Sequence, residues 1–168
     1  MAFDILKLPK ERFLQEMAAR FPDTSPTVHQ TLLAFLRVSS DVLNSIERYF
    51  EKHGLSVGRF QILLLLLRER ERGINPSELA EQAGVTRATI TGLLDGLDRA
   101  GLVWREKDSE DRRGITIRIT SSGIDLMEKI LPGHYRRISI LMEKMNSTDC
   151  EGMNLFLQKI REGLDDLE

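Results

Sequence analysis

Residues 75–120 read NPSELAEQAGVTRATITGLLDGLDRAGLVWREKDSEDRRGITIRIT, and this stretch decides the fold. The Asn-Pro pair at its start and Thr86 further on are helix start signals, because Asn and Thr side chains cap helix N-termini and proline suits the first helical position. A glycine follows each segment and ends it. The pattern predicts two short consecutive helices, over residues 76–83 and 87–99, joined by a tight turn.

A change of periodicity follows the second of these helices. Residues 102–106 (LVWRE) and 115–119 (ITIRI) are short β-branched or aromatic stretches, and the second alternates apolar with polar side chains, as strands do. The segment between them, residues 107–114, is polar and charged and should project into solvent. Two strands with these boundaries form a hairpin, so the whole stretch predicts a helix-turn-helix followed by a wing.

Helical periodicity continues on both sides of this unit. It predicts helices over residues 10–20 and 27–53, and a helix to about residue 70 that Ser56 can cap. It also predicts a long helix of about 25 residues from Ser121 or Ser122 that Pro132 kinks, and a last helix from Thr148 with Glu151 in its capping box. The last helix carries an apolar stripe that needs a partner helix. Its members are Met153, Leu157, Ile160, Leu164 and Leu167.

The fold class that follows is mainly α with a small β-hairpin. We expect one domain over residues 1–168, in which residues 55–120 form a winged helix-turn-helix lobe that binds DNA. The segments 1–53 and 121–168 supply long dimerisation helices on either side of it.

The composition excludes several classes of protein. The chain has 168 residues with 24 Lys and Arg against 26 Asp and Glu, a net charge of −2, and Cys150 is its only cysteine. A lone cysteine excludes an intrachain disulfide framework and a multi-cysteine metal site. The longest apolar run, Ile62 to Leu67, is far shorter than the roughly 20 residues of a membrane span. With no secretion signal at the N-terminus, we expect a cytoplasmic protein without a membrane partner.

The second short helix is the candidate recognition helix, since an α-helix fits the major groove of DNA. When Ile90, Leu93, Leu94 and Leu97 face the core, small and polar side chains face outward and permit close approach to base edges. The candidate DNA contacts on this helix are Thr86, Arg87, Ala88, Thr89, Thr91, Gly92 and Asp95. Thr86 is first of all a helix cap, and a phosphate contact would add to that role.

In these residues the chain resembles the MarR family of winged-helix transcription regulators. The matching fragments are PSELAE at 76–81, GVTRATIT at 84–91, GLV at 101–103 with Arg105, DSEDRR at 108–113, and Ile-Thr-x-x-Gly at 119–123. The resemblance implies a homodimer with interlocking N- and C-terminal helices, whose two lobes engage a pseudo-palindromic operator on double-stranded DNA, most often as a repressor. Two-fold symmetry would place the half-sites about one DNA turn, roughly 10 base pairs, apart.

The wing motif of this family, Asp-x-Arg, falls on Asp111 and Arg113. The resemblance implies that Arg113 enters the minor groove while Asp111 orients it, and Arg112 could add a phosphate contact.

A small aromatic or phenolic effector is also implied, because members of the family often bind one between the dimer helices and the lobe. The candidate lining residues here are Arg37, Tyr49, His53 and Phe60. Urate-responsive branches carry a tryptophan in their N-terminal helix, whereas the only tryptophan of this chain is Trp104, so the resemblance does not extend to urate.

Each assignment has a simpler alternative. Arg112 and Arg113 stand among acidic residues and could form only a solvated, self-paired loop. Trp104 could pack on the hairpin or stack on DNA or ligand. Cys150 could be an incidental thiol or a redox sensor. The main alternative function is a winged-helix module for protein–protein interaction without sequence-specific DNA binding.

Enzyme chemistry has no support in the sequence. It contains no Gly-x-Ser-x-Gly, no phosphate-binding glycine loop and no His-Glu-x-x-His. His29, His53 and His134 lack the close spacing of a zinc site. We therefore expect no enzyme, no metal and no cofactor.

Overall fold

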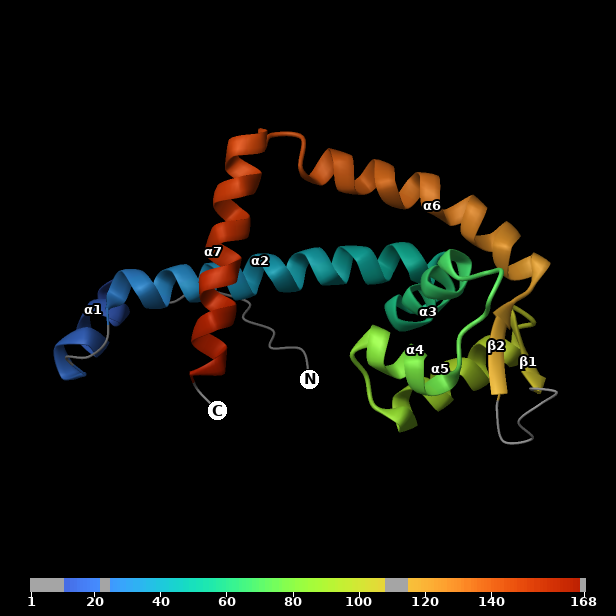
Figure 1. Cartoon of the computed structure of the whole chain (residues 1–168). Coiled ribbons are helices and arrows are strands. Elements are labelled where there is room, and N and C mark those ends of the chain that lie inside the picture. The colour runs from blue at the N-terminus through green and yellow to red at the C-terminus, as the bar shows by residue number, and fades with distance from the viewer. Residues whose placement is uncertain (1–10, 22–24, 108–114, 167–168) are drawn as a thin grey trace. The chain divides into compact units, whose positions relative to one another are not determined.

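The computed structural model describes residues 11–21, 25–107 and 115–166 (Figure 1). Its elements are α1 (Glu11–Arg20), α2 (Pro26–Glu51), α3 (Val57–Arg68), α4 (Pro76–Ala83), α5 (Arg87–Arg99), β1 (Val103–Lys107), β2 (Ile115–Ile119), α6 (Ser121–Leu141) and α7 (Ser147–Asp165). The fold is mainly α with one β-hairpin, as the sequence predicts. The chain divides into two compact units, Met1–Thr120 and Ser121–Glu168, which we describe separately.

The three helices of the lobe begin at the predicted N-caps. Ser56, Asn75 and Thr86 each accept a hydrogen bond through the side-chain oxygen from the backbone N–H three residues later, over 3.3, 2.9 and 3.2 Å. These bonds satisfy one of the N–H groups that a helix start leaves without an intrahelical partner. The local sequence therefore sets where α3, α4 and α5 begin.

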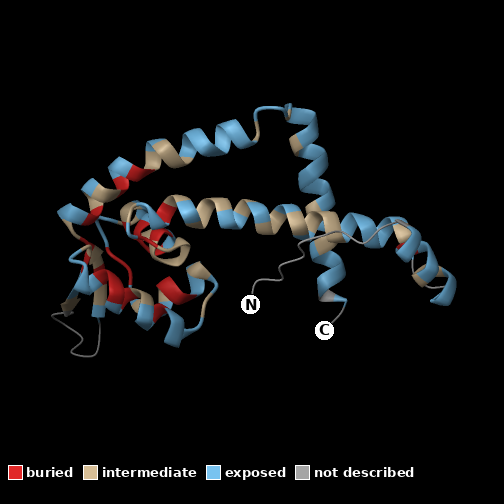
Figure 2. Cartoon of the chain, turned by 180° about the vertical axis from the view of Figure 1, so that it is seen from behind, coloured by how far each residue is buried: buried red, intermediate tan, exposed pale blue. Residues whose placement is uncertain are grey.

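The core of the first unit lies in the lobe, where Figure 2 shows most of its buried residues. The buried side chains come from α3, α4, α5, the hairpin and the connection between α3 and α4: Phe60, Ile62, Leu63, Leu66, Ile74, Leu79, Ala80, Ile90, Leu94, Leu97, Val103, Ile117 and Ile119. The end of α2 joins this core through Phe50, whose ring stacks on Phe60 with 4.0 Å between centroids. The two rings are 1% and 4% exposed, so α2 is anchored to the lobe by buried aromatic surface.

The hairpin pairs in register from Val103 with Ile119 to Lys107 with Ile115. Its first strand lies one residue later than the predicted 102–106. A third segment joins this sheet, because Ile74 exchanges both backbone hydrogen bonds with Ile117, over 3.1 and 2.8 Å. The connection between α3 and α4 therefore runs beside β2 and ties the hairpin to the helices.

Gly73 makes this third pairing sterically feasible. Its φ is +71°, a conformation that L side chains rarely adopt. A Cβ atom at this position would lie 2.5 Å from Cγ2 of Thr116 and 3.0 Å from the carbonyl oxygen of Ile117. The chain can approach β2 this closely only because residue 73 has no side chain.

Two predictions for the second unit are wrong in detail. The last helix begins at Ser147, with Asn146 as N-cap, because the Asn146 side chain accepts from the N–H of Asp149 and the Asp149 carboxylate accepts from the N–H of Asn146. The predicted start at Thr148 is therefore too late, since Asn is a stronger cap than Thr. α6 is also shorter than predicted, with 21 residues, and Pro132 lies inside it as expected.

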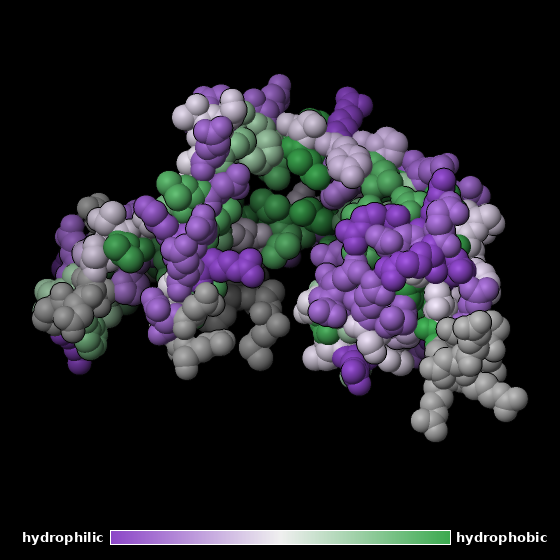
Figure 3. Space-filling view, in the orientation of Figure 1, coloured by the Kyte–Doolittle hydropathy of each residue, from purple (hydrophilic) through white to green (hydrophobic). Residues whose placement is uncertain are grey.

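The long helices leave many apolar side chains exposed. These are Val28, Leu32, Leu36, Val38 and Leu43 on α2, Tyr135, Ile138, Ile140 and Leu141 on α6, and Met153, Leu155, Phe156 and Leu164 on α7. Figure 3 shows green, hydrophobic residues at the surface of the helices outside the lobe, while the lobe itself is mainly purple in that view. Met153 and Leu164 of the predicted α7 stripe are 43% and 57% exposed, and Leu167 lies outside the described residues.

Two kinds of feature are absent from the part of the chain that the structure describes. No helix there combines the length and the apolar composition that crossing a membrane requires. No three His, Cys, Asp or Glu side chains there are grouped so that they could hold a metal ion.

Candidate nucleic-acid interface

The candidate recognition helix is α5, and threonine hydroxyls organise its first turn. Thr86 Oγ1 caps the helix and lies 2.9 Å from Thr89 Oγ1. One turn on, Thr91 Oγ1 donates to the carbonyl oxygen of Arg87 over 2.9 Å. The Thr86 and Thr91 hydroxyls thus bond to the backbone of α5, and Arg87 between them is exposed on the helix surface.

The structure places every DNA-contact candidate of α5 on its exposed side. Of the four predicted core residues, Ile90, Leu94 and Leu97 are buried and Leu93 is half-buried. The exposed residues include all the candidates: Thr86, Arg87, Ala88, Thr89, Thr91, Gly92 and Asp95. A Cβ added to Gly92 would meet no atom within 4 Å, so the helix surface there is open. The exposed face of α5 carries small side chains and is accessible, which suits insertion into the major groove.

Asp95 differs from the other candidates because its carboxylate already has a cationic partner. Arg105 of β1 donates from Nη2 to Asp95 Oδ1, and its Nε lies 3.6 Å from Asp98 Oδ2. One guanidinium thus bridges two carboxylates that lie one turn apart on α5. Asp95 therefore connects the helix to the hairpin.

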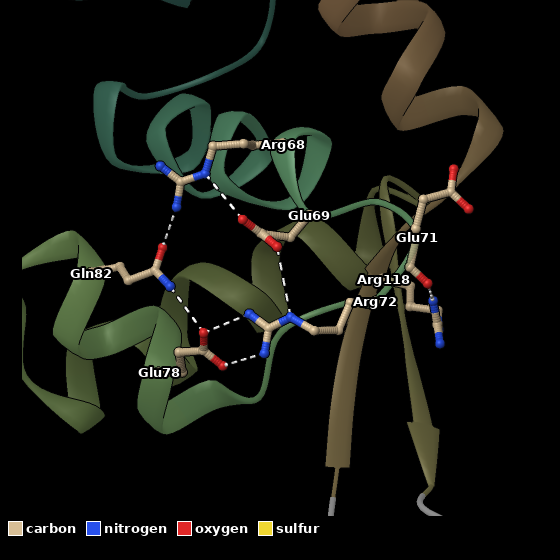
Figure 4. Close-up of polar contacts among 7 residues, drawn as sticks. All are labelled: Arg68, Glu69, Glu71, Arg72, Glu78, Gln82 and Arg118. Carbon is tan, nitrogen blue, oxygen red and sulfur yellow. Dashed lines mark hydrogen bonds and ion pairs between the residues drawn. The ribbon is translucent and has the colours of Figure 1, made fainter.

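A second group of ion pairs joins the end of α3 to α4 (Figure 4). The Arg72 guanidinium binds the Glu78 carboxylate through two nitrogens, over 2.7 and 3.3 Å. This hydrogen bonding lowers the pKa of Glu78 and raises the pKa of Arg72, so both stay charged at neutral pH. Gln82 donates to Glu78 over 3.0 Å and accepts from Arg68 over 2.7 Å. The network fixes α4 against the end of α3.

Arg118 of β2 connects the hairpin to the segment between α3 and α4. Its Nη1 donates to the carbonyl oxygen of Glu71 over 2.9 Å, and its Nε donates to the carboxylate of Glu106 on β1. Together with the Ile74–Ile117 pairing, these bonds attach both strands to the connection between α3 and α4.

The wing-tip candidates, Asp111, Arg112 and Arg113, lie outside the described residues. The strands on either side of that segment are described, and β1 carries Trp104 with 42% of its surface exposed. Trp104 is therefore not part of the buried core of the lobe, and packing on the hairpin and stacking on DNA or ligand both stay open for it.

The effector candidates fall into two places. Tyr49 and His53 meet edge to face near the end of α2, with 5.0 Å between ring centroids. Phe60 belongs to the same region, where it is buried against Phe50. Arg37 lies about three turns earlier on α2, roughly 18 Å along its axis, and its Nε binds Asp41 over 3.3 Å. Within one chain the structure brings three of the candidates into one region but not Arg37.

A pocket of about 250 Å³ lies elsewhere, between α1 and α2. It is lined by Phe13, Leu14, Met17, Phe21, Pro26, His29 and Leu33. None of the effector candidates lines it. The apolar side of the helix predicted over residues 10–20 indicated that this side packs against another element. Periodicity does not show which helix that element is.

Sequence reasoning did not identify the ionic partners of Arg105 and Arg118. A signal for Arg105 was present, because residues two apart on a strand share a face and Val103 is apolar. Arg105 therefore had to lie on the side of the hairpin that meets the helices. Which carboxylate it would meet depends on how β1 packs on α5, and that is a tertiary property.

Comparison with known proteins places this geometry among DNA-binding regulators. The family model described as MarR family matches residues 55–115. Over 146 residues the chain is 38% identical to the HTH-type transcriptional repressor YetL of Bacillus subtilis (strain 168), with 87% of each chain covered.

Two solved structures with DNA share the fold. The S. aureus MepR–DNA complex matches with a TM-score of 0.68 and 23% identity, over 78% of this chain and 94% of that chain. Sco3205 from Streptomyces coelicolor, in complex with DNA, matches with a TM-score of 0.76 and 19% identity, over 84% of this chain and 89% of that chain.

Proposed function

Since the chain belongs to the MarR family, whose members are transcription regulators and not enzymes, we propose that it is a homodimeric repressor that binds a pseudo-palindromic operator. The observation that carries the proposal is the exposed face of α5, with its capped N-terminus and its small side chains. A helix of this kind fits the major groove, and a helix N-terminus attracts phosphate.

On this proposal the exposed residues at the start of α5 have roles that their chemistry suits. Arg87 reaches a guanine edge or a phosphate from the first turn, and the methyl group of Thr91 contacts a thymine methyl. Ala88 has a small side chain and Gly92 has none, so the backbone of α5 can approach the base edges closely. Thr86 and Thr89 lie at the N-terminus of α5, where phosphate contacts are made.

The wing supplies the second part of the interface. We assign minor-groove binding to Arg113, its orientation to Asp111 and a phosphate contact to Arg112, as the family motif implies. The support is that the motif stands between β1 and β2, on the hairpin that Arg105 and Arg118 attach to the helices.

Replacing Arg113 with alanine should weaken DNA binding about tenfold, within the roughly 1–3 kcal/mol typical of a specific arginine contact. The measurement is fluorescence anisotropy at fixed salt, with labelled DNA from the promoter next to the protein's own coding region. Arg70→Ala is the matched control, because it removes one exposed arginine that pairs locally with Glu71. Equal affinities for the wild type and Arg113→Ala would reject the wing assignment, and no binding by the wild type would favour the protein–protein alternative.

Dimerisation is proposed through the long helices, on the support of their exposed apolar side chains. Replacing Met153 and Leu164 together by aspartate places two charges on the α7 stripe, and burying them in an interface without partners is unfavourable. We expect the doubly substituted full chain to be monomeric by light scattering at concentrations where the wild type is a dimer. Gln158→Asp, at an exposed position off the stripe, should leave the dimer intact. A dimer that persists in the double variant would exclude the stripe from the interface.

An aromatic effector is proposed for the cleft between the dimer helices and the lobe. The support is the aromatic grouping of Tyr49, His53 and Phe60, with Arg37, which shares α2 with Tyr49, as a polar contributor. Such a ligand changes DNA affinity only if it binds two arrangements of the lobes with different free energies.

A further inference from the structure

Arg105 occupies an unusual position between the two DNA-binding elements of the lobe. It belongs to β1, yet its guanidinium binds Asp95 and lies within 3.6 Å of Asp98, both on α5. Because Asp95 and Asp98 are three residues apart, they lie on one face of the helix. A single side chain of the hairpin thus contacts α5 at two points along its axis.

The start of β1 is fixed by other bonds. The N–H of Leu102 donates to the carbonyl oxygen of Leu97 over 3.0 Å, and the Thr120 hydroxyl donates to that of Gly101 over 2.8 Å. Val103 is buried in the core. Arg105 stands two residues further along the strand, so its two contacts attach β1 to α5 a second time beyond this fixed point.

Stability alone gives little reason for this arrangement. The side chains of Arg105, Asp95 and Asp98 are 39%, 50% and 47% exposed. Ion pairs with this exposure contribute little to the free energy of unfolding, because solvent screens them. Two carboxylates on the outer side of a DNA-binding helix are also unfavourable toward phosphate, unless they serve another purpose.

We propose that Arg105 is a positioning residue for DNA recognition, which sets the direction of the hairpin relative to α5 by bridging Asp95 and Asp98. Asp95 then acts on DNA through Arg105 and not as a direct base contact. The inference rests on the proposed function, because it concerns how the two DNA-binding elements are held in register.

The substitution Arg105→Lys separates the positioning role from two simpler roles, a phosphate contact and neutralisation of the two carboxylates. Lysine keeps the positive charge, so it would preserve a phosphate contact or the neutralisation of the carboxylates. It has no planar fork, so it cannot engage two separated carboxylates in the same fixed geometry. Positioning therefore predicts a loss of affinity for Arg105→Lys, whereas charge alone predicts none.

The experiment measures the affinity for the same promoter DNA by anisotropy, with folding checked by circular dichroism and thermal melting. We expect Arg105→Gln to weaken binding about tenfold, which corresponds to about 1.4 kcal/mol, and Arg105→Lys to lose a large part of the same affinity. Melting should hardly change for either variant. Arg70→Gln is the matched control, because it also removes one positive charge from the lobe. Arg70 pairs with Glu71 and does not link α5 to β1, so the affinity of this variant should stay near that of the wild type.

The partner carboxylates provide the second arm of the test. Asp95→Asn with Asp98→Asn should weaken binding as Arg105→Gln does, and adding Arg105→Gln to that pair should cause no further loss, since all three residues act as one unit. Wild-type affinity in Arg105→Lys, tighter binding in the double asparagine variant, or additive losses would each overturn the inference. A wild type that does not bind the promoter would instead reject the proposed function itself.

Discussion

Replacing Gly73 with alanine should destabilise the lobe by about 3 kcal/mol, the sum of a left-handed backbone conformation and a steric overlap. The residue has a φ of +71°, and its added Cβ would lie 2.5 Å from a methyl group of Thr116 and 3.0 Å from a backbone oxygen. Thr116 is short and β-branched, so its methyl group cannot swing away as the end of a long side chain could, and the carbonyl oxygen of Ile117 belongs to the sheet. Relief of the overlap must therefore disturb the Ile74–Ile117 pairing.

Urea denaturation at a fixed protein concentration measures this effect, with Gly54→Ala as the matched control. Gly54 has a φ of +73°, yet a Cβ there would meet nothing within 4 Å. The control should lose only the conformational part, about 1 kcal/mol. If both variants lose the same free energy of unfolding, the close approach at Gly73 is not a source of destabilisation.

Replacing Phe50 with alanine should cost about 4 kcal/mol, the range found when a fully buried phenylalanine is truncated. The ring is 1% exposed and stacks on Phe60, so its removal leaves a cavity between α2 and α3 that the surrounding helices cannot close. The loss is larger than for most core positions because this pair joins the long helix to the lobe.

The same denaturation experiment, with Phe13→Ala as control, tests this expectation. Phe13 is also a phenylalanine on a helix, but it is 51% exposed, so its truncation should cost about 1 kcal/mol or less. A midpoint for Phe50→Ala close to that of the control would show that the stacked pair contributes little to holding α2 on the lobe.

Local features of the fold were predictable from the sequence. The N-caps Ser56, Asn75 and Thr86 and the outward face of α5 depend on residues within one helical turn of each other, and short-range rules describe them well. The cap of α7 was the exception. Two capping patterns overlap there, one with Asn146 and Asp149 and one with Thr148 and Glu151, and only the former is used.

The contacts that assemble the lobe were not predictable in this way. The bridge from Arg105 to Asp95, the bond from Arg118 to Glu71 and the approach of Gly73 to β2 all join residues whose proximity follows from packing. Periodicity states which face of a strand is apolar, but it does not state which helix that face meets. The candidate DNA contacts on α5 were predictable as surface residues, whereas the ion pair of Asp95 was visible only in three dimensions.

The pairing of Ile74 with Ile117 has a consequence for how the lobe folds. It joins two positions far apart in the chain, with α4, α5 and β1 between them. Closing so long a loop costs chain entropy that only the completed core repays. We therefore expect the hairpin to open together with the helices, so that the amide hydrogens of both residues exchange with solvent at the rate of the cooperative opening of the lobe.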